Sequence, residues 1–301
     1  MSVVGLVVIG RNEGERLKQC LRAARAGGAS HLVYVDSNST DGSADWARSF
    51  GADVVDLDMT RAFTAARARN AGARRLLEVA PQTQFIQFVD GDCELQPGWI
   101  AAGAAALESR PKVAAVCGRL RERHPDASIY NRLCDMEWDI PLGEIDTCGG
   151  VAMIRRQAFE QVGGFCETMI AGEEPDMCFR MRKAGWVILR IDAEMGLHDA
   201  AITRFGQWWK RQIRNGHAYA EGHFRNSAPP EHFWRRNVLS NFFWAAFFPF
   251  LPLLYLKLLV RYRNELLARF IALTKIPQAI GQLKFYWTHW RGGHTGLIEY
   301  K

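Results

Sequence analysis

The sequence predicts an α/β fold with a mostly parallel central sheet, followed by a helical segment of different composition. Three observations support this prediction. Short apolar runs alternate with helix-like segments through the first two thirds of the chain. Two aspartates, Asp90 and Asp92, follow one of these apolar runs. The most apolar stretch, Val238–Val260, lies apart from the alternating segments, beyond a linker that ends in two prolines.

Strands are expected wherever a short apolar run is bounded by polar or turn residues. The runs that meet this criterion are Val3–Ile9, His31–Val35, Val54–Leu57, Phe85–Val89 and Val113–Val116. Segments with helical spacing of apolar residues separate them, at 13–26, 41–50, 63–77 and 98–107. Repeated strand–helix units of this length predict parallel strands that are joined by right-handed crossovers.

Helix ends and the later elements are also readable. Ser39 is expected to cap the second helix, and Gly51 is expected to end it. The pattern becomes irregular from Gly118 to Cys148, which is typical of mixed structure bordering a site. A strand-like run at 186–191 and a helix at 203–221 complete this part of the chain.

Composition and charge narrow the classes of partner. The chain has 301 residues, 48% of them hydrophobic, and a formal charge of +6 that is concentrated late in the sequence. Such a skew favours an anionic partner, namely a nucleotide diphosphate, a lipid phosphate or a membrane surface. We expect no nucleic-acid partner, because helix-turn-helix, zinc-finger and RNA-recognition signatures are missing.

The cysteines and the N-terminal run point to an intracellular chain. None of the seven cysteines forms a Cys-x-x-Cys pair, so neither a disulfide framework nor structural zinc is indicated. We expect small buried hydrophobic residues in a reducing compartment. The apolar run at 3–9 soon meets Arg11 and Glu13, which favours a first strand over a signal peptide.

The Asp90-Gly91-Asp92 triplet is the main candidate for chemistry. It follows the run Phe85–Val89, and ligands of open α/β sheets bind at the carboxyl ends of strands. Paired carboxylates suit Mg²⁺ or Mn²⁺ that also holds a diphosphate. The triplet alone is ambiguous, because most acidic turn residues are simply solvated.

Five segments in order resemble the motifs of a family 2 glycosyltransferase of the GT-A (nucleotide-diphospho-sugar transferase) fold. They are Val8-Ile9-Gly10-Arg11-Asn12-Glu13, Val35-Asp36-Ser37-Asn38-Ser39-Thr40-Asp41-Gly42-Ser43, Ala68-Arg69-Asn70-Ala71-Gly72, Asp90-Gly91-Asp92 and Gly172-Glu173-Glu174. The run 176–186 is similar to the helix that follows the last motif. The resemblance implies a catalytic domain over residues 1–224 and an inverting, metal-dependent sugar transfer from a nucleotide-diphosphate donor, with a UDP-sugar favoured.

The resemblance also implies which residues bind the donor. They are Gly10, Arg11, Asn12, Glu13, Asp36, Arg69, Asp90 and Gly150. Asp36 would accept hydrogen bonds from the base or ribose, or else only from its own turn. Arg69 would lie against the base or the diphosphate, whereas Arg67, Arg74 and Arg75 are expected at the surface.

A divalent cation, Mn²⁺ or Mg²⁺, is expected at the end of the fourth predicted strand. By the resemblance, Asp92 ligates this metal, and Asp90 contacts the ribose or a metal-bound water. His198 is a candidate further ligand, because some GT-A enzymes place a metal-binding histidine after the strand at 186–191. The alternative is a histidine that is merely hydrogen-bonded. The metal would neutralise charge on the departing nucleotide diphosphate.

The resemblance assigns the catalytic base to Glu174, which would take the proton of the acceptor hydroxyl. The family usually has Asp at this position, and the extra methylene of Glu changes its reach. Glu173 is therefore an alternative base. Pro175 and these acids also suit the first turn of a helix without any catalysis, and Asp176 is interpreted as a helix-start residue.

The helix at 203–221 carries three further candidate binding residues. Trp208 would stack on an acceptor sugar or pack in the core, and Arg211 and Arg214 would contact phosphate. The segment 207–211 reads Gln-Trp-Trp-Lys-Arg. It departs from the Gln-x-x-Arg-Trp motif of processive family members, which puts processivity in doubt.

Residues 225–301 are expected to form a helical, membrane-associating region. The stretch 238–260 is nominally long enough to span a bilayer. However, Lys257 shortens its uncharged core, and Pro249 and Pro252 would break or kink it. Both flanks are basic, which disfavours a single span. We expect a peripheral or re-entrant anchor at the cytoplasmic face of a bacterial inner membrane, or alternatively a buried helical hairpin.

The sequence thus predicts a hexosyltransferase-like enzyme that glycosylates a hydroxyl of a glycan or lipid-linked glycan in cell-surface polysaccharide synthesis. One alternative is a polyprenyl-phosphate monosaccharide synthase, whose phosphate acceptor needs no strong base. Another is a non-catalytic membrane scaffold on a transferase fold. A dinucleotide oxidoreductase is rejected, because the first predicted strand is not followed by Gly-x-Gly-x-x-Gly.

Overall fold

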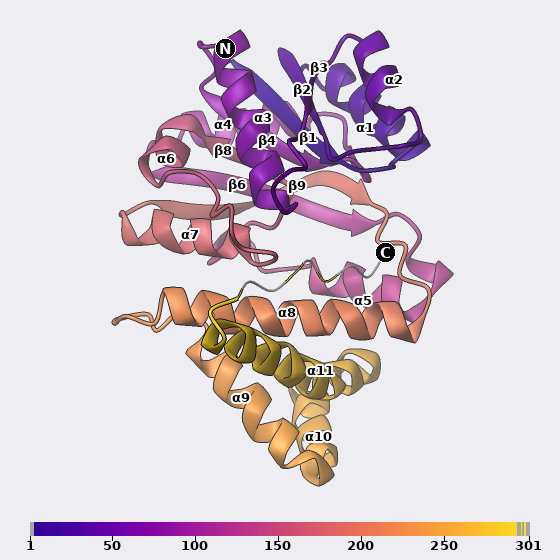
Figure 1. Cartoon of the computed structure of the whole chain (residues 1–301), viewed down its shortest axis with the longest axis vertical. Coiled ribbons are helices and arrows are strands. Elements are labelled where there is room, and N and C mark those ends of the chain that lie inside the picture. Colours follow the sequence, from indigo (N-terminus) through magenta and orange to yellow (C-terminus); the bar gives the residue numbers. More distant parts are fainter. Residues whose placement is uncertain (1–2, 294–295, 297, 299–301) are drawn as a thin grey trace. The chain divides into compact units, whose positions relative to one another are not determined.

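The computed structural model describes residues 3–293, 296 and 298 of the chain (Figure 1). The chain divides into two compact units. Unit 1 comprises Met1–Arg123, Trp138–Thr168 and Glu173–Ala200, and unit 2 comprises His124–Glu137, Met169–Gly172 and Ala201–Lys301. The expected division after residue 224 does not coincide with a break between these units, because the preceding helix groups with the later ones. The extent of the catalytic domain stays a prediction.

A mixed sheet forms the centre of unit 1. Its strands are β1 (Val4–Gly10), β2 (His31–Asp36), β3 (Asp53–Asp56), β4 (Phe85–Asp90), β5 (Cys93–Leu95), β6 (Val113–Glu122), β7 (Gly143–Glu144), β8 (Ala152–Arg155) and β9 (Val187–His198). Their order is β3-β2-β1-β4-β8-β6-β9-β5, with β7 on β9. The predicted parallel sheet is confirmed for β3, β2, β1 and β4. Beyond β4, β8 runs antiparallel between β4 and β6, so the sheet is mixed overall.

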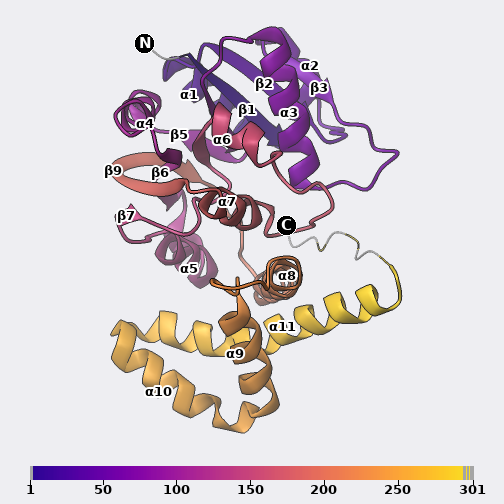
Figure 2. The same cartoon turned by 90° about the vertical axis from the view of Figure 1, so that its left-hand side faces the viewer.

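Helices cover both faces of this sheet. They are α1 (Glu15–Ala26), α2 (Ser43–Ser49), α3 (Ala65–Val79), α4 (Trp99–Glu108), α6 (Arg156–Gln161) and α7 (Glu173–Lys183). Figure 2 shows the sheet between α4 and α3. The contact of α3 with β1 is close, because a Cβ on Gly72 would lie 2.3 Å from Val7 Cγ1. The core is mainly apolar, with Leu6, Val7 and Val8 of β1 fully buried.

The expected cap of α2 is wrong, and its expected end is confirmed. The N-cap residue is Gly42, which has no side chain, and the backbone N–H of Ser43 donates instead to Asp41 Oδ1 at 3.0 Å. Ser39 is displaced from that role because its Oγ accepts a hydrogen bond of 2.9 Å from the backbone N–H of Asn12. At the other end, Gly51 has a φ of +84°, the left-handed conformation that commonly ends a helix.

The irregular segment 118–148 contains mixed structure, as expected. β6 continues through it to Glu122, a short 3₁₀ turn follows at Pro125–Ala127, and α5 (Ile129–Glu137) belongs to unit 2. The short strands β5 and β8 and the helix α6 were not predicted. Strands of three or four residues carry too little periodicity for recognition from sequence.

Unit 2 is helical in its described part. Besides α5 it contains α8 (Phe205–Arg225), α9 (Arg235–Ala246), η2 (Phe248–Phe250), α10 (Leu251–Tyr262) and α11 (Glu265–Trp290). α8 and α11 lie side by side in Figures 1 and 2. Their backbones nearly touch, because a Cβ on Gly281 would lie 2.0 Å from the carbonyl oxygen of Ile213. A Cβ on Gly216 would lie 2.0 Å from that of Gln278.

The apolar stretch 238–260 is broken, as its prolines predicted. α9 ends before Phe247, Pro249 lies in η2, and Pro252 lies in the first turn of α10. Proline is tolerated there because the first turn of a helix needs no backbone N–H donor. α9 and the η2–α10 segment meet at 97°. Within the described residues, no single helix combines the length and apolarity of a membrane span, whereas this bent pair together does.

Candidate active site

The loops after β1 and β2 hold each other in place. The backbone N–H of Thr40 donates to Asn12 Oδ1 at 2.7 Å, and that of Gly14 donates to Asp41 Oδ2 at 3.0 Å. Asn12 itself has a φ of +56°, a conformation in which asparagine is over-represented. The two motifs that resemble a nucleotide site therefore form one surface. Gly10, Arg11, Asn12 and Glu13 all lie in its first loop or at the end of β1.

Asp36 is buried at the end of β2, beside a hollow of about 380 Å³. Its Oδ1 accepts from the Tyr34 hydroxyl at 2.9 Å, and its Oδ2 accepts from the backbone N–H of Ser39 at 2.8 Å. Burial, together with the charge of Asp36, raises the pKa of Tyr34. The turn hydrogen bonds foreseen for Asp36 are thus present. Its contact with a nucleotide stays a prediction.

Arg69 joins two acidic residues from different elements. Its Nη2 donates to Asp90 Oδ1 at 2.7 Å and its Nη1 donates to Glu173 Oε1 at 2.6 Å. Burial alone would lower the pKa of Arg69, but the two carboxylates outweigh it and raise that pKa. Gly150 lies against the same group, because a Cβ there would be 2.8 Å from Arg69 Nη2. Arg69 therefore positions carboxylates, whereas its expected contact with base or diphosphate stays untested.

Asp92 and His198 lie together, although they are far apart in the sequence. β5 pairs antiparallel with β9 and places Cys93 opposite His198. As a result, His198 Nε2 lies 3.3 Å from Asp92 Oδ1, and both side chains are largely buried. His198 Nδ1 is buried and has no hydrogen-bond partner among the described residues. β9 extends further than expected, so His198 ends the strand instead of following it.

Glu174 is anchored through one of its two carboxylate oxygens. Oε1 accepts from the Cys148 backbone N–H at 2.7 Å, the Cys148 thiol at 3.3 Å and the Cys178 thiol at 2.9 Å. None of the hydrogen bonds found among the described residues uses Oε2. Burial raises the pKa of Glu174, against the lowering effect of these hydrogen bonds. The residue thus combines a fixed orientation with a strengthened affinity for a proton.

The rest of the acidic segment has a structural role. Asp176 Oδ2 accepts from Arg180 Nε at 2.9 Å, and Arg180 Nη2 donates to the carbonyl of Gly164 at 2.8 Å. Asp176 is fully buried in the first turn of α7. This agrees with its expected position at the start of a helix, where a carboxylate faces the positive end of the helix dipole.

Trp208 and Arg211 lie in unit 2. Trp208 is buried among aromatic rings, with centroids 5.0 Å from Phe270 and 6.4 Å from Tyr130. This geometry fits the packing role that was foreseen, and stacking on an acceptor stays a prediction. Arg211 Nη1 lies 2.8 Å from Glu137 Oε2, and Arg214 Nη2 donates to the carbonyl of Ile170 at 3.1 Å.

Arg67 differs from its predicted surface position. Arg67 is buried and does not lie at the surface, because its guanidinium donates to three carbonyl oxygens at the turn before α3. The acceptors are Asp58 at 2.7 Å, Arg61 at 2.9 Å and Ala62 at 2.7 Å. These contacts fix the chain that leads into the helix carrying Arg69.

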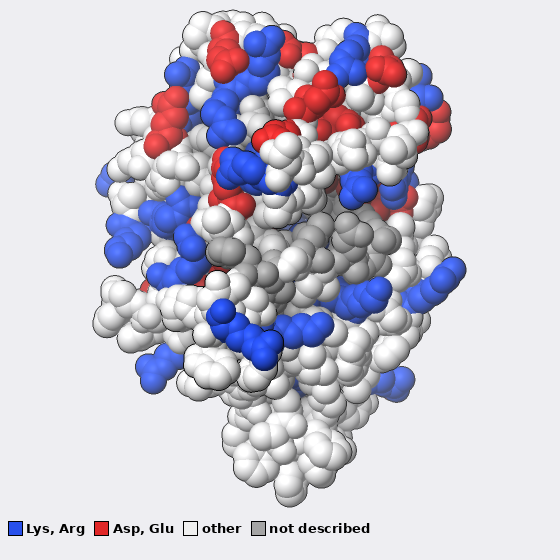
Figure 3. Space-filling view, in the orientation of Figure 1, with Lys and Arg blue, Asp and Glu red and all other residues white. Residues whose placement is uncertain are grey.

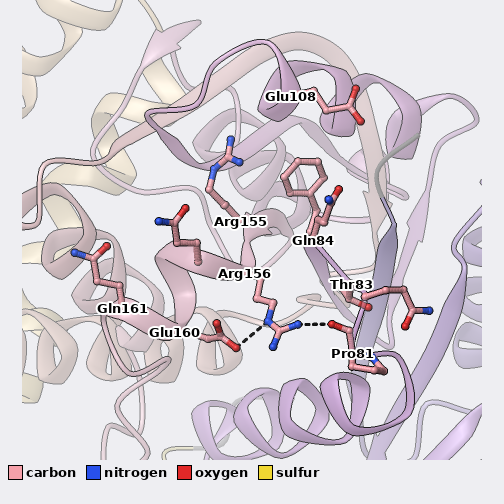
Figure 4. A pocket seen from close by; sticks show the side chains of 11 residues that line it. Pro81, Thr83, Gln84, Glu108, Arg155, Arg156, Glu160 and Gln161 are labelled. Atoms are coloured by element: carbon pink, nitrogen blue, oxygen red, sulfur yellow. Dashed lines mark hydrogen bonds and ion pairs between the residues drawn. The ribbon is translucent and has the colours of Figure 1, made fainter.

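A hollow of about 800 Å³ lies at the other end of the sheet (Figure 4). It is lined by residues around the start of β4 and the end of β8, including Phe85 and Arg155. Arg156 crosses it between the Pro81 carbonyl and Glu160, as drawn in Figure 4. Phe85 and Asp90 are the first and last of the six residues of β4, so they lie roughly 17 Å apart along an extended strand. This hollow is therefore distant from the acidic triplet.

Several residues of the site were not found from sequence. Cys148 and Cys178 orient Glu174, and the ring of Trp138 lies 4.7 Å from that of His198. Glu174 and Cys178 are four residues apart on α7, which places them on one helix face. This spacing is the one sequence signal that could have identified Cys178 as a partner of Glu174. It is informative only after Glu174 has been chosen as a candidate base.

Together, the parallel strands, the acidic triplet after β4 and the loops after β1 and β2 define a glycosyltransferase of the GT-A fold. A solved structure with a similar fold is the mannosyltransferase PcManGT from Pyrobaculum calidifontis in complex with GDP-Man and Mn²⁺. The two share 17% identity and a TM-score of 0.64, over 95% of this chain and 87% of that one.

Residues 6–163 match the family model "Glycosyl transferase family 2", and residues 143–287 match "Glycosyl transferase family group 2". The chain therefore belongs to glycosyltransferase family 2.

Two curated relatives agree with this assignment. Glycosyltransferase AglE of Haloferax volcanii is 24% identical, with 72% of each chain covered. The O-antigen chain rhamnosyltransferase WbaN of Salmonella anatum is 30% identical, with 53% of each chain covered. This chain thus spans about half the length of the second relative. The protein is a glycosyltransferase.

Proposed function

We propose that this glycosyltransferase moves a sugar, with inversion, from a nucleotide-diphosphate donor to a hydroxyl of a glycan or lipid-linked glycan. The process would be cell-surface polysaccharide synthesis. The observation that carries the proposal is the pairing of Asp92 with His198, 3.3 Å apart, next to Asp90 at the end of β4.

The side chains at this position fit a divalent cation. Asp92 supplies a carboxylate oxygen and His198 a ring nitrogen, and Asp90 ends the same strand. Carboxylates suit Mn²⁺ and Mg²⁺, and an imidazole ligand favours Mn²⁺ of the two. When bound, either cation would neutralise charge on the diphosphate that leaves with the nucleotide.

The donor would occupy the loops after β1 and β2. The hollow beside Asp36 would take the base and ribose, and the interlocked loop of Arg11 and Asn12 would lie along the nucleotide. We favour a UDP-sugar. A GDP-sugar belongs in the same test, because the similar mannosyltransferase carries GDP-Man.

Glu174 would act as the base. Because Oε1 is held by three donors, Oε2 is the atom that is left to receive the proton of the acceptor hydroxyl. The raised pKa of Glu174 strengthens it as a proton acceptor. Proton removal as the acceptor oxygen attacks C1 from the face opposite the leaving group gives inversion.

Arg69 would keep Glu173 from acting as the base. Its ion pair with Glu173 holds that carboxylate toward Asp90, whereas Glu174 faces Cys148. Glu173 is the alternative base, and its use would require this ion pair to open.

Membrane association is the second part of the proposal. Eight apolar side chains on α9, η2, α10 and the turn between them are each 49–80% exposed. They are Leu239, Phe243, Phe247, Phe248, Phe250, Leu253, Leu256 and Val260. On the face that Figure 3 shows, the tip of unit 2 carries no acidic or basic side chain. Such a surface suits a re-entrant or peripheral anchor at the cytoplasmic face of a bacterial inner membrane.

A panel of nucleotide sugars tests the catalytic proposal. Purified protein should hydrolyse or transfer from one donor only when Mn²⁺ or Mg²⁺ is present, and that donor should raise the melting temperature. Full activity in excess chelator would contradict the metal, and binding without any turnover would favour a scaffold. A polyprenyl-phosphate acceptor is the remaining alternative, and turnover that survives Glu174→Gln would favour it.

A further inference from the structure

Two buried thiols meet the carboxylate of the proposed base, and the proposed reaction assigns no chemistry to the thiols themselves. Cys148 lies in the loop between β7 and β8, and Glu174 and Cys178 lie one turn apart on α7. All three are at most 6% exposed. Their ligand atoms Sγ, Oε1 and Sγ lie within 4.8 Å of one another. We call these three residues the thiol–carboxylate cluster.

We infer that the thiol–carboxylate cluster binds a thiophilic divalent cation of the zinc class, and that this cation inhibits the enzyme by capturing Glu174. The second half of this inference rests on the proposed role of Glu174 as the base. The first half concerns binding alone and stands independently of it.

The distances within the cluster are close to those of a zinc site. Zinc bonds of about 2.3 Å to sulfur and about 2.0 Å to oxygen, at tetrahedral angles, place two sulfurs about 3.8 Å apart and sulfur about 3.5 Å from oxygen. The two Sγ atoms are 3.6 Å apart, and Glu174 Oε1 lies 3.3 Å from Cys148 Sγ and 2.9 Å from Cys178 Sγ. Only the last distance must open by more than a few tenths of an ångström.

Replacing the two thiol protons by a divalent cation also leaves the charge of the cluster unchanged. Burial raises the pKa of Cys178, and a hydrogen bond that Cys148 donates to Cys178, together with burial, raises the pKa of Cys148, so both are thiols without metal. On binding, each thiol gives its proton to solvent and each sulfur bonds the cation. Two protons are then replaced by one divalent charge, so the net charge beside an ionised Glu174 is unchanged. The buried site therefore gains no extra charge to desolvate.

The ligand set selects against the cation that the reaction would use. Thiolates prefer zinc and similar soft ions, whereas carboxylates and water suit Mg²⁺ and Mn²⁺. A cation would have a short path from solvent to the cluster, because buried Cys148 is followed by the exposed Gly149 in the same loop. Cys117 of β6 is a further buried thiol near the cluster. Burial raises the pKa of Cys117 to about 12, and the negative charges of Glu174 and Cys178 contribute to this increase.

A titration with Cd²⁺ as the probe tests binding without any assay of activity. Reduced, chelator-treated protein in excess Mn²⁺ should gain a thiolate-to-cadmium charge-transfer band that saturates at one equivalent. Cys178→Ala and Glu174→Gln should weaken Cd²⁺ binding by at least about 10–100-fold, the loss typical even of residues behind the ligands. Cys166→Ala is the matched control, because this half-buried cysteine lies outside the cluster.

Two results would overturn binding. One is a missing band at one equivalent, and the other is a band that Cys178→Ala and Glu174→Gln both retain. Glu174→Gln keeps the shape of the side chain, so it remains informative if the cysteine variant folds poorly.

Inhibition is tested separately with Zn²⁺ on the active wild-type enzyme. Turnover should fall as Zn²⁺ is added in excess Mn²⁺, and a chelator should restore it. Recovery with a reductant instead of a chelator would indicate a Cys148–Cys178 disulfide and overturn metal capture. Cadmium binding with no effect on turnover would leave the metal site in place and contradict the role of Glu174.

Discussion

The carboxylate of Glu173 lies 2.6 Å from the guanidinium of Arg69, which also binds Asp90 at 2.7 Å. The adjacent Glu174 makes no such ion pair with any residue that the structure describes, and it is held by a backbone amide and two thiols. Neighbouring carboxylates in such different surroundings are a common basis for different roles in a reaction. This contrast separates the two candidate bases more clearly than their order in the sequence does.

Glu174→Gln should lower kcat by about 10²–10⁴, the usual range for loss of a general base. Donor affinity should change little, because Glu174 is assigned to the acceptor side. Steady-state kinetics with varied donor and acceptor would measure both. Glu173→Gln is the matched comparison, and a larger loss of kcat in that variant would move the base by one residue.

Asp92→Asn should lower activity by at least about 10²–10³, because it removes a charged ligand while keeping the shape of the side chain. The circular dichroism spectrum should be unchanged. Asp126→Asn, at an exposed carboxylate of the 3₁₀ turn, serves as a control and should keep full activity. Wild-type rates in Asp92→Asn would refute the metal assignment.

Gly281→Ala should destabilise unit 2 by about 1–3 kcal/mol or more, because its Cβ would lie 2.0 Å from a carbonyl oxygen of α8 and force the two helices apart. Chemical denaturation would measure the free energy of unfolding. Gly206→Ala in α8 is the matched control, since a Cβ there would meet no atom of another described segment within 4 Å. That control should stabilise by up to about 1 kcal/mol, the difference in helix propensity.

His217 should make the stability of unit 2 depend on pH. Burial lowers the pKa of this histidine from 6.5 to about 4, so the folded protein favours the neutral ring. The corresponding stability is present above pH 6.5 and is lost as the pH falls toward 4, on the order of 3 kcal/mol in total. Urea denaturation at pH 7 and pH 4.5 should show a smaller difference for His217→Gln than for wild type. If the stability difference between the two pH values is equal in wild type and His217→Gln, groups other than His217 dominate the pH dependence. His124→Gln, at an exposed histidine, is the control for the substitution itself.

The double variant Phe248→Ser and Leu253→Ser should weaken binding to anionic lipid vesicles at least tenfold. These two side chains are 61% and 60% exposed, and burying each in a lipid interface is worth about 1.5–3 kcal/mol when complete. Co-sedimentation with vesicles would measure it. Ile129→Ser on α5, 45% exposed, is the control. If the double variant binds vesicles as wild type does, α9 and α10 are not the anchor.

The order of strands and helices in the first half of the chain was predictable, because hydrophobic periodicity is a local property. β1 and β4 were found within one or two residues from their apolar runs. The position of Asp90 and Asp92 at the end of β4 followed from the same periodicity. The break at Pro249 was equally local, since proline removes a donor wherever it stands.

Pairings between distant segments were not predictable in this way. The placement of His198 beside Asp92 depends on the register of β5 with β9, and the two strands come from separate parts of the chain. The antiparallel strand β8 is likewise too short for its sequence pattern to predict that it pairs with β4 and β6.

The surroundings of the candidate base also depend on folding. Local sequence placed Glu173 and Glu174 together at the start of a helix. Their separation into an ion pair with Arg69 and hydrogen bonds with Cys148 arises because α3, α7 and the loop before β8 converge. The pKa of a carboxylate depends on its burial and on nearby charges. For these two glutamates, both arise only when the three segments come together, so no single segment of sequence contains them.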